Sequence, residues 1–405
     1  MKQFVVFKIL LLIFAAAISI AAQDDYEKPF PKVPKSVDKA EDFAPAEWKV
    51  EKVVQGDLNN DGRSDVAMTI TNGENGFDEK AQRAAYLTRV LVIAFRGVDG
   101  MLTRSAVSAD VVYDGDEGGA FGDPFEDLKI ERGTVVINHY GGSRNRWGYT
   151  HVFRWQQNRW MLIGLNESSM DTADLDYENS QDINLSTGLV EARYSGELNE
   201  ETNKRIPAKN GAYYELQVIP VTSAPSLDGK IDANEWQGYS LNLNSKRQIY
   251  KGTTLWKGAK DLSAKLTAVY FGNQLYLLAE VTDNDFAKGD SVRLVTKKGI
   301  EIKAAETKTM KTATGYILES RYAILDIARA TMEKDNYALK HLEEVFANPK
   351  NTNEIGGATF EAAIEVVDVD AGKQRAILST RLSGSPYMGS IRTHSSGSVF
   401  LTDED

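Results

Sequence analysis

Short apolar runs alternate with polar residues and turn-formers along most of the chain. Up to about residue 220 the runs are a few residues long and are separated by Gly, Asn and Asp, a pattern typical of β-strands. The expected strands are 65–70, 88–95, 134–138, 149–155, 160–164 and 214–221. Residues 77–86 form the one helical candidate. The pattern predicts a β-rich domain over residues 44–215.

A turn-forming segment, 223–226, separates this part from a second set of runs. The strands expected there are 264–271, 274–281, 291–296, 315–323, 360–367 and 375–380. Residues 274–282 are apolar on both faces, which favours a strand inside a sandwich. A helical pattern follows at 325–347, where Lys and Glu indicate an exposed insert. We therefore expect a mainly all-β protein whose residues 222–405 form a jelly-roll-like β-sandwich.

The N-terminus carries the pattern of a secretory signal. Lys2 and Lys8 precede an apolar run, which ends in small residues at Ala21-Ala22. The run is too short for a good membrane anchor. We expect a signal peptide at 1–22, a charged and proline-containing linker at 23–43, and no membrane span after cleavage. The expected location is the periplasm or the outside of the cell.

Composition excludes several kinds of functional site and of partner. The chain of 405 residues is long enough for two domains and has no cysteine, which excludes disulfides, thiolate metal sites and Cys nucleophiles. Its formal charge of −11 argues against nucleic acid as a partner, because phosphate binding needs clustered Lys and Arg. Cations and neutral sugars remain compatible with it.

Residues 57–65, DLNNDGRSD, place oxygen-bearing side chains at alternate positions around Gly62. Calcium prefers several hard oxygen ligands of this kind, and a backbone carbonyl can add another. The alternative is an Asx-rich turn without an ion. The predicted ligands of a structural calcium ion are Asp57, Asn59, Asp61, Arg63 through its carbonyl, and Asp65.

This stretch resembles the FG-GAP or VCBS-type calcium loops of exported β-rich proteins. The likeness extends through the segments 122–125, 139–143 and 153–155, which look like secreted proteins that carry one such loop. The resemblance implies a calcium-binding β-rich domain.

The second half resembles the family 9 carbohydrate-binding modules over about residues 222–403. The resemblance rests on an ordered set of segments: PSLDGKIDANEW at 225–236, QLYLLAEVTD at 274–283, GDSV at 289–292, GYILE at 315–319 and EVVDVD at 365–370. It implies a β-sandwich that often bears calcium and binds sugars without cleaving them.

Aromatic side chains are the candidate sugar contacts. Family members that bind chain ends hold the ring between two tryptophans, one of them just before the Asp-Ser-Val stretch. Here that loop, 284–289, contains Phe286 and no Trp. Trp256 is a second candidate, and Trp147, in a polar run of the first domain, is a third. Packing in the core is the alternative for each of them.

A second acidic group occurs in the same loop region. Asp283, Asp285 and Asp290 could together hold a cation, and a solvated acidic turn is the alternative.

The sequence contains no Gly-x-Ser-x-Gly elbow, no His-Glu-x-x-His helix and no phosphate-binding glycine loop. We therefore expect an exported, non-catalytic protein that binds a glycan or cell-envelope polysaccharide and holds structural calcium. The first alternative is an envelope scaffold that binds proteins and has lost sugar binding. The second is a glycoside hydrolase-associated protein.

Overall fold

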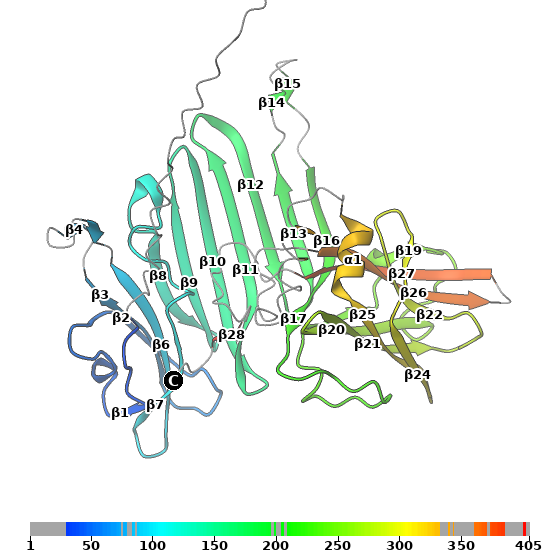
Figure 1. Ribbon diagram of the computed structural model, residues 1–405, viewed down its shortest axis with the longest axis horizontal. Coiled ribbons are helices and arrows are strands. Elements are labelled where there is room, and N and C mark those ends of the chain that lie inside the picture. The colour runs from blue at the N-terminus through cyan, green and yellow to red at the C-terminus, as the bar shows by residue number, and fades with distance from the viewer. Residues whose placement is uncertain are drawn as a thin grey trace, which may run out of the picture.

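The computed structural model describes residues 30–73, 76–78, 83–85, 87–195, 198–199, 204–205, 209–332, 339–340, 343, 360–370, 373–384 and 400–401. Strands make up most of this part of the chain. They form two lobes that are joined by one long sheet (Figure 1). The predicted all-β class is confirmed. The expected signal peptide, 1–22, lies outside the described residues.

The long sheet has 13 strands and runs through the whole molecule. In spatial order its main path is β23 (Glu301–Ile302), β22 (Ser291–Val295), β26 (Phe360–Asp370), β27 (Lys373–Gly384), β16 (Lys209–Gln217), β13 (Leu189–Tyr194), β12 (Asp174–Asn184), β11 (Arg159–Asp171), β10 (Asn145–Gln156), β9 (Thr134–Gly142) and β8 (Phe125–Glu131). Two short strands pair off this path: β19 (Ile249–Lys251) with β27 and β28 (Phe400–Leu401) with β11.

The first lobe packs a five-stranded sheet against the β8–β11 end of the long sheet. In spatial order its strands are β1 (Ser36–Val37), β7 (Leu102–Ser108), β6 (Thr88–Arg96), β3 (Asp65–Asn72) and β2 (Lys49–Gly56). One face of β3 presents Val66, Met68 and Ile70 to the N-terminal segment, and Ala67 on the other face lies in the core shared with the long sheet. The strand is therefore buried on both faces, which explains why Val66, Ala67 and Met68 follow one another without a polar residue.

The second lobe packs a six-stranded sheet against the other end of the long sheet. Its strands are β17 (Ile219–Pro220), β20 (Leu262–Phe271), β21 (Gln274–Asp283), β25 (Gly315–Ala323) and β24 (Glu306–Thr312), with β18 (Ser240–Leu243) pairing to β20. In β21, Leu275 and Leu277 face the main core, whereas Tyr276 and Leu278 pack with Trp236 on the opposite face. This is the two-faced burial predicted for residues 274–282.

Several shorter elements complete the fold. They are the 3-10 turns η1 (Ala40–Phe43), η2 (Gly119–Phe121) and η3 (Lys246–Gln248), the pairs β4 (Gly76–Asp78) with β5 (Arg83–Ala85) and β14 (Leu198–Asn199) with β15 (Lys204–Arg205), and the helix α1 (Ile324–Thr331). No helix within the described ranges has the length and apolarity needed to cross a membrane.

Two helix predictions need correction. Within 77–86, the described residues belong to the antiparallel pair β4–β5, so the helical pattern there is overridden by strand pairing. The first turns of the helix predicted over 325–347 are present as α1, and this part is not an exposed insert; most of the remaining segment lies outside the described residues. Ile324, Ile327 and Ala328 are buried in the main core, because their spacing places all three on one helix face.

The segment predicted as a linker, 23–43, also differs from expectation in its described part. Val33, Val37, Ala40 and Phe43 are buried and pack against the five-stranded sheet. Four apolar side chains among the polar ones are enough to anchor the segment, so residues 33–43 belong to the first lobe.

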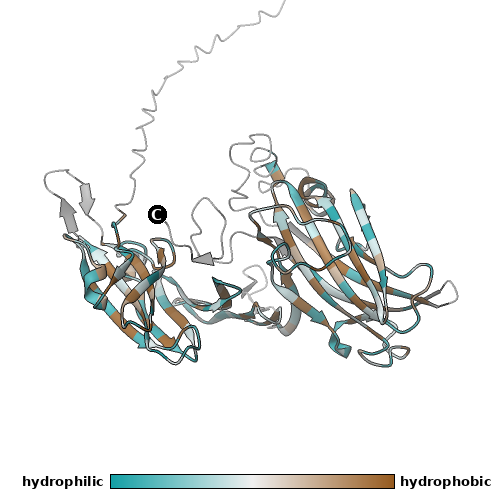
Figure 2. Cartoon of the chain, turned by 90° about the horizontal axis from the view of Figure 1, so that it is seen from below, coloured by the Kyte–Doolittle hydropathy of each residue, from teal (hydrophilic) through white to brown (hydrophobic). Residues whose placement is uncertain are grey.

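The long sheet continues across the boundary predicted near residue 215. The two predicted domains meet where β16 pairs in parallel with β27 through Glu215–Arg381, Leu216–Leu382 and Gln217–Ser383. The two lobes lie on either side of a thin central region in Figure 2. The connection between them is thus a hydrogen-bonded sheet.

Candidate metal centre and ligand groove

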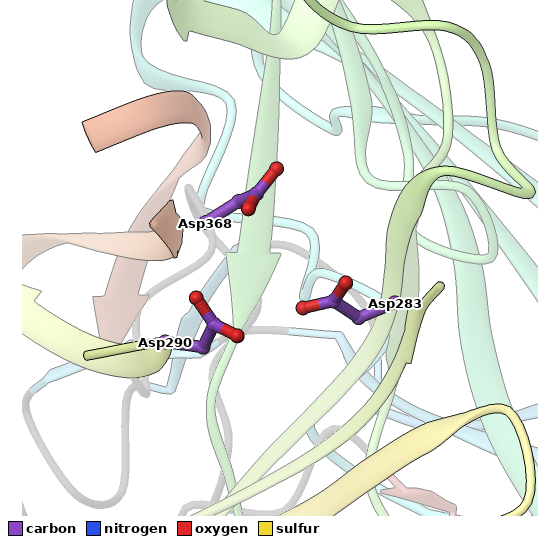
Figure 3. A group of neighbouring side chains, drawn as sticks. All are labelled: Asp283, Asp290 and Asp368. Atoms are coloured by element: carbon purple, nitrogen blue, oxygen red, sulfur yellow. The ribbon is translucent and has the colours of Figure 1, made fainter. Parts of the chain in front are cut away.

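Three carboxylates from distant parts of the chain meet in the second lobe, and we call them the carboxylate cluster: Asp283, Asp290 and Asp368. Each offers one oxygen within 4.8 Å of the others, and the three groups point toward one another (Figure 3). Asp283 ends β21 of the six-stranded sheet, whereas Asp368 lies in β26 of the long sheet. The cluster therefore bridges the two facing sheets of the lobe.

Backbone N–H groups fix the orientation of two of these carboxylates. The amide of Asp285 donates to Asp283 at 2.9 Å, and the amide of Val369 donates to Asp290 at 2.7 Å. Each bond uses one oxygen and leaves Asp283 with its other oxygen directed into the cluster. The loop between β21 and β22 is thus held by its own acidic residues.

Arg375 supplies the nearest positive charge. Its guanidinium contacts Asp368 at 2.6 Å, and it also pairs with Asp261 at 3.0 Å. One cation is therefore shared between two buried acids, and it does not balance the charge of the three cluster carboxylates when they are ionised.

Three buried oxygens around the cluster have no hydrogen-bond partner among the described residues: Oδ2 of Asp283, Oδ1 of Asp368 and the hydroxyl of Tyr316. The residues are 4%, 1% and 1% exposed, respectively. Unpartnered buried polar atoms are rare in folded proteins because each one loses its hydration without compensation. A hard divalent cation, which takes several oxygen ligands, fits this donor set.

The electrostatics of the cluster agree with this fit. Burial first, and then the neighbouring Asp290 and Asp368, raise the pKa of Asp283 to about 6. Burial also raises the pKa of Asp368, against the opposing effect of Arg375. Burial and the three acids together raise the pKa of the Tyr316 hydroxyl. Ionising all the carboxylates is therefore unfavourable unless another positive charge is present.

The carboxylate cluster contains two of the three residues of the second predicted metal group, and their role as metal ligands stays a prediction. Asp283 and Asp290 lie in the cluster, whereas Asp285 is exposed and contributes its backbone N–H. Asp368 was not among the predicted candidates, because it lies in a strand distant in sequence. The segment 365–370 carries three acids, Glu365, Asp368 and Asp370, and the sequence alone does not tell that Asp368 faces the cluster.

The calcium-like loop, residues 57–65, has a different arrangement. Asp57 accepts the amides of Asp61 and Gly62 at 3.2 and 2.9 Å, and Asn59 accepts that of Asp61 at 3.1 Å. Asp61 accepts the amide of Arg63 at 2.9 Å and pairs with its guanidinium. The predicted side-chain ligands thus hold the turn together.

Asp65 is the buried anchor of that loop. It is 0% exposed, and its two oxygens accept the backbone N–H groups of Leu58 and Arg96, each at 2.8 Å. Burial raises the pKa of this carboxyl, and the two hydrogen bonds oppose the rise. Within the described ranges, three close carboxylates occur at the cluster in the second lobe and not here. The calcium loop stays a prediction.

Two of the three predicted aromatic contacts lie against the core of the second lobe. Trp256 is half-buried, and its indole N–H donates to the carbonyl of Leu262 at 2.8 Å. Phe286 is half-buried with its ring centre 4.5 Å from that of Tyr316, beside the carboxylate cluster. Both side chains therefore have packing roles, and neither presents a free face comparable to an exposed aromatic ring.

Trp147 lies in a different setting, on β10 of the long sheet. Its ring centre is 5.1 Å from that of Tyr149, two residues along the same strand face. Tyr149 in turn borders a shallow groove of about 120 Å³ that crosses β10 to β13, which we call the sheet groove. Its lining residues are Tyr149, Glu167, Ser168, Ser169, Asn179, Ser180, Gln181 and Tyr194.

Cross-strand register explains why this groove is polar between two aromatic rings. Tyr149 pairs with Glu167, which pairs with Gln181, so the three side chains form one row across three strands. Gln181 donates to the hydroxyl of Tyr194 at 2.7 Å, at the far side of the groove. Burial raises the pKa of Glu167. The groove therefore offers amide, carboxyl and hydroxyl groups between two tyrosines.

Two buried histidines lie beside Tyr149 on the same face of the long sheet. His151 stacks against Tyr149 at 6.3 Å, and its ring centre is 5.8 Å from that of His139. Burial lowers the pKa of His139 to about 3 and that of His151 to about 4. These two histidines therefore add no positive charge beside the sheet groove at neutral pH.

The sequence singled out Trp147 in this region, but it did not identify the residues that line the sheet groove. Their signal is spread over four strands as single Tyr, Glu, Asn and Gln residues. Comparison of the chain with protein-family models and with curated proteins found no match. The resemblances to calcium-loop proteins and to family 9 carbohydrate-binding modules accordingly stay predictions.

Proposed function

We propose that this protein is an exported, non-catalytic binding protein that holds a glycan or cell-envelope polysaccharide in the sheet groove. Its second lobe would be stabilised by a divalent cation at the carboxylate cluster. The cation would be calcium, because the ligands there are all oxygens. The observation that carries the proposal is the row of polar side chains between Tyr149 and Tyr194.

The chemistry of the groove supports a sugar ligand. Aromatic faces pack against the apolar faces of sugar rings, and amide and carboxyl groups exchange hydrogen bonds with ring hydroxyls. Gln181 and Glu167 stand on neighbouring strands in a fixed register, so their spacing is set by the sheet and not by a loop. A shallow site across several strands suits an extended chain that passes over the sheet.

The cation would act on the fold. It would neutralise carboxylates from both facing sheets, and its ligands would include the oxygens of Asp283 and Asp368 that lack partners. Export, expected from residues 1–22, would expose the chain to environments where millimolar calcium is available. The predicted loop at 57–65 is a second candidate for the same ion.

Titration calorimetry of the chain from residue 23 onward against a glycan panel, with calcium present and after chelation, tests the proposal. Tyr149→Ala and Tyr194→Ala should each weaken binding by about tenfold, because each removes an aromatic contact worth over 1 kcal/mol. Tyr250→Ala is the matched control, since Tyr250 is 73% exposed on β19, outside the groove.

No binding by a folded, calcium-loaded chain would contradict the glycan proposal and favour the envelope scaffold. Release of shortened glycan products during the titration would contradict the non-catalytic assignment.

A further inference from the structure

A second hollow lies where the long sheet passes from the central region into the second lobe. This junction cavity has a volume of about 220 Å³. It is lined by residues of β13, β16, β26, β27 and η3, and the strands β16 and β27 lie side by side there (Figure 1). It shares none of its lining residues with the sheet groove.

Two arginines face this cavity, Arg247 from η3 and Arg381 from β27. Among the described residues neither forms an ion pair with a carboxylate, in contrast to Arg375 on the same strand, which pairs with two. The guanidinium of Arg381 lies 4.0 Å from the ring centre of Tyr213. This cation–π contact orients the group without neutralising it.

The other polar groups of the cavity are hydroxyls. Tyr214 and Ser379 line it, and Thr380 donates its own hydroxyl to the carbonyl of Tyr214 at 2.9 Å. Two guanidinium groups with adjacent hydroxyls form a donor-rich site in a chain whose net charge is −11. Guanidinium donors match the planar geometry of a carboxylate, which can accept two parallel hydrogen bonds.

We propose that the junction cavity binds a carboxylate-bearing sugar residue, a hexuronate unit of an acidic glycan. The carboxylate lies between Arg247 and Arg381, and the hydroxyl of Ser379, on the same strand face as Arg381, contacts a ring hydroxyl. The cavity has room for one such unit and not for a chain. This inference extends the proposed glycan function, and it names acidic polysaccharides as the ligand class.

Calorimetric titration of the chain from residue 23 onward with glucuronate, glucose and inorganic phosphate tests the inference. We expect glucuronate to bind and glucose to bind at least about tenfold more weakly, because hydrogen bonds to a charged group are the strong ones. Raising the salt concentration should weaken glucuronate binding, because these arginines are exposed and salt screens exposed charges. Equal binding of glucuronate and phosphate would overturn the sugar assignment, since it would show recognition of an anion alone.

Variants then locate the site. Arg247→Gln and Arg381→Gln should each weaken glucuronate binding by about tenfold or more, and Arg381→Lys should recover only part of it, because lysine keeps the charge but loses the planar fork. Lys246→Gln is the matched control, since Lys246 is exposed in the same η3 turn and does not line the cavity. Unchanged binding in both glutamine variants, with the fold checked by thermal melting, would overturn the inference.

The groove variant Tyr149→Ala separates this inference from the proposed function. If it weakens neutral glycan binding while glucuronate binds equally well to wild type and to Arg381→Gln, the junction inference fails and the groove function stands. If no panel glycan binds but glucuronate binds through the two arginines, the groove function fails and the junction inference stands.

Discussion

The two acidic sites of this molecule have similar chemistry and opposite surroundings. In the loop 57–65, each predicted side-chain ligand already accepts a hydrogen bond from the turn itself. In the carboxylate cluster, Asp283 and Asp368 each keep a buried oxygen without a partner. Acids in a local motif can thus be satisfied by the backbone N–H groups of their own turn. Acids that tertiary structure brings together keep negative charge that nearby donors do not compensate. The second situation is the one that calls for a cation.

The largest effect is expected from removing the buried anchor of the loop. Asp65→Ala should lower the free energy of unfolding by about 3 kcal/mol, because the amides of Leu58 and Arg96 would both lose their acceptor inside the protein. Urea denaturation measures the change. Asp57→Ala is the comparison, since its bonds are exposed and its loss should cost less. Equal losses would mean that Asp57 has a role beyond the turn.

Calcium should stabilise the protein through the cluster. At about 100 times its dissociation constant, the ion adds about 2.7 kcal/mol to the free energy of unfolding. We expect Asp368→Asn to remove this gain in scanning calorimetry and Asp61→Asn to leave it intact. If Asp61→Asn removes the gain and Asp368→Asn does not, calcium binds in the loop 57–65 and the carboxylate cluster does not hold the ion.

Without a cation, neutralising a cluster acid should increase stability. A carboxyl whose folded pKa is raised to about 6 loses stability as pH rises from about 4 to above 6, because the unfolded chain releases the proton first. At pH 7.5 in chelator, Asp283→Asn should therefore be more stable than wild type by on the order of 1–2 kcal/mol.

The groups that face Asp283 explain why its neutralisation should be stabilising. Asp290 and Asp368 repel the charge of Asp283, and Arg375 pairs with Asp368. Comparing variant and wild type at each pH removes the contribution of the buried histidines, which is common to both. A variant less stable than wild type at pH 7.5, yet equal at pH 4, would show that the carboxylates do not repel one another.

The smallest expected effect concerns backbone strain in the loop. Gly62 has φ of 81°, so Gly62→Ala should cost about 1 kcal/mol. Gly100→Ala is the matched control, because Gly100 has φ of 84° and equally open surroundings. If the loop binds calcium as the sequence predicts, Gly62→Ala should also weaken binding of the ion while Gly100→Ala does not.

The strands were the part of this fold that the sequence could predict, because runs such as 65–70 and 274–281 are short, apolar and bounded by turn-forming residues. What the sequence could not predict depends on partners far along the chain. In the described part of 77–86, the pairing of β4 with β5 overrides the helical pattern of the sequence. The burial of α1 follows from contact with β26 and β25, which its own sequence does not specify.

The same reason explains the gaps in the predicted sites. Asp368 joins Asp283 only because β26 packs across from β21, and residues 85 positions apart carry no shared local signal. Tyr149 and Tyr194 border one groove because three hairpin connections place β10 to β13 side by side. Trp256, by contrast, was a reasonable candidate by composition, yet its indole N–H is already bonded to Leu262.

The unbroken long sheet has a mechanical consequence. The first lobe includes β8 to β11, so three strand-to-strand steps lead from β11 to β16, and at about 4.8 Å each they set a span of about 14 Å between the two lobes. A flexible loop linker would let the two lobes move independently of each other. A continuous hydrogen-bonded sheet allows only bending or twisting of the sheet as a whole. A pull on one lobe is therefore transmitted to the other through the backbone bonds that join β16 to β27, and a ligand lying over the sheet would stiffen it.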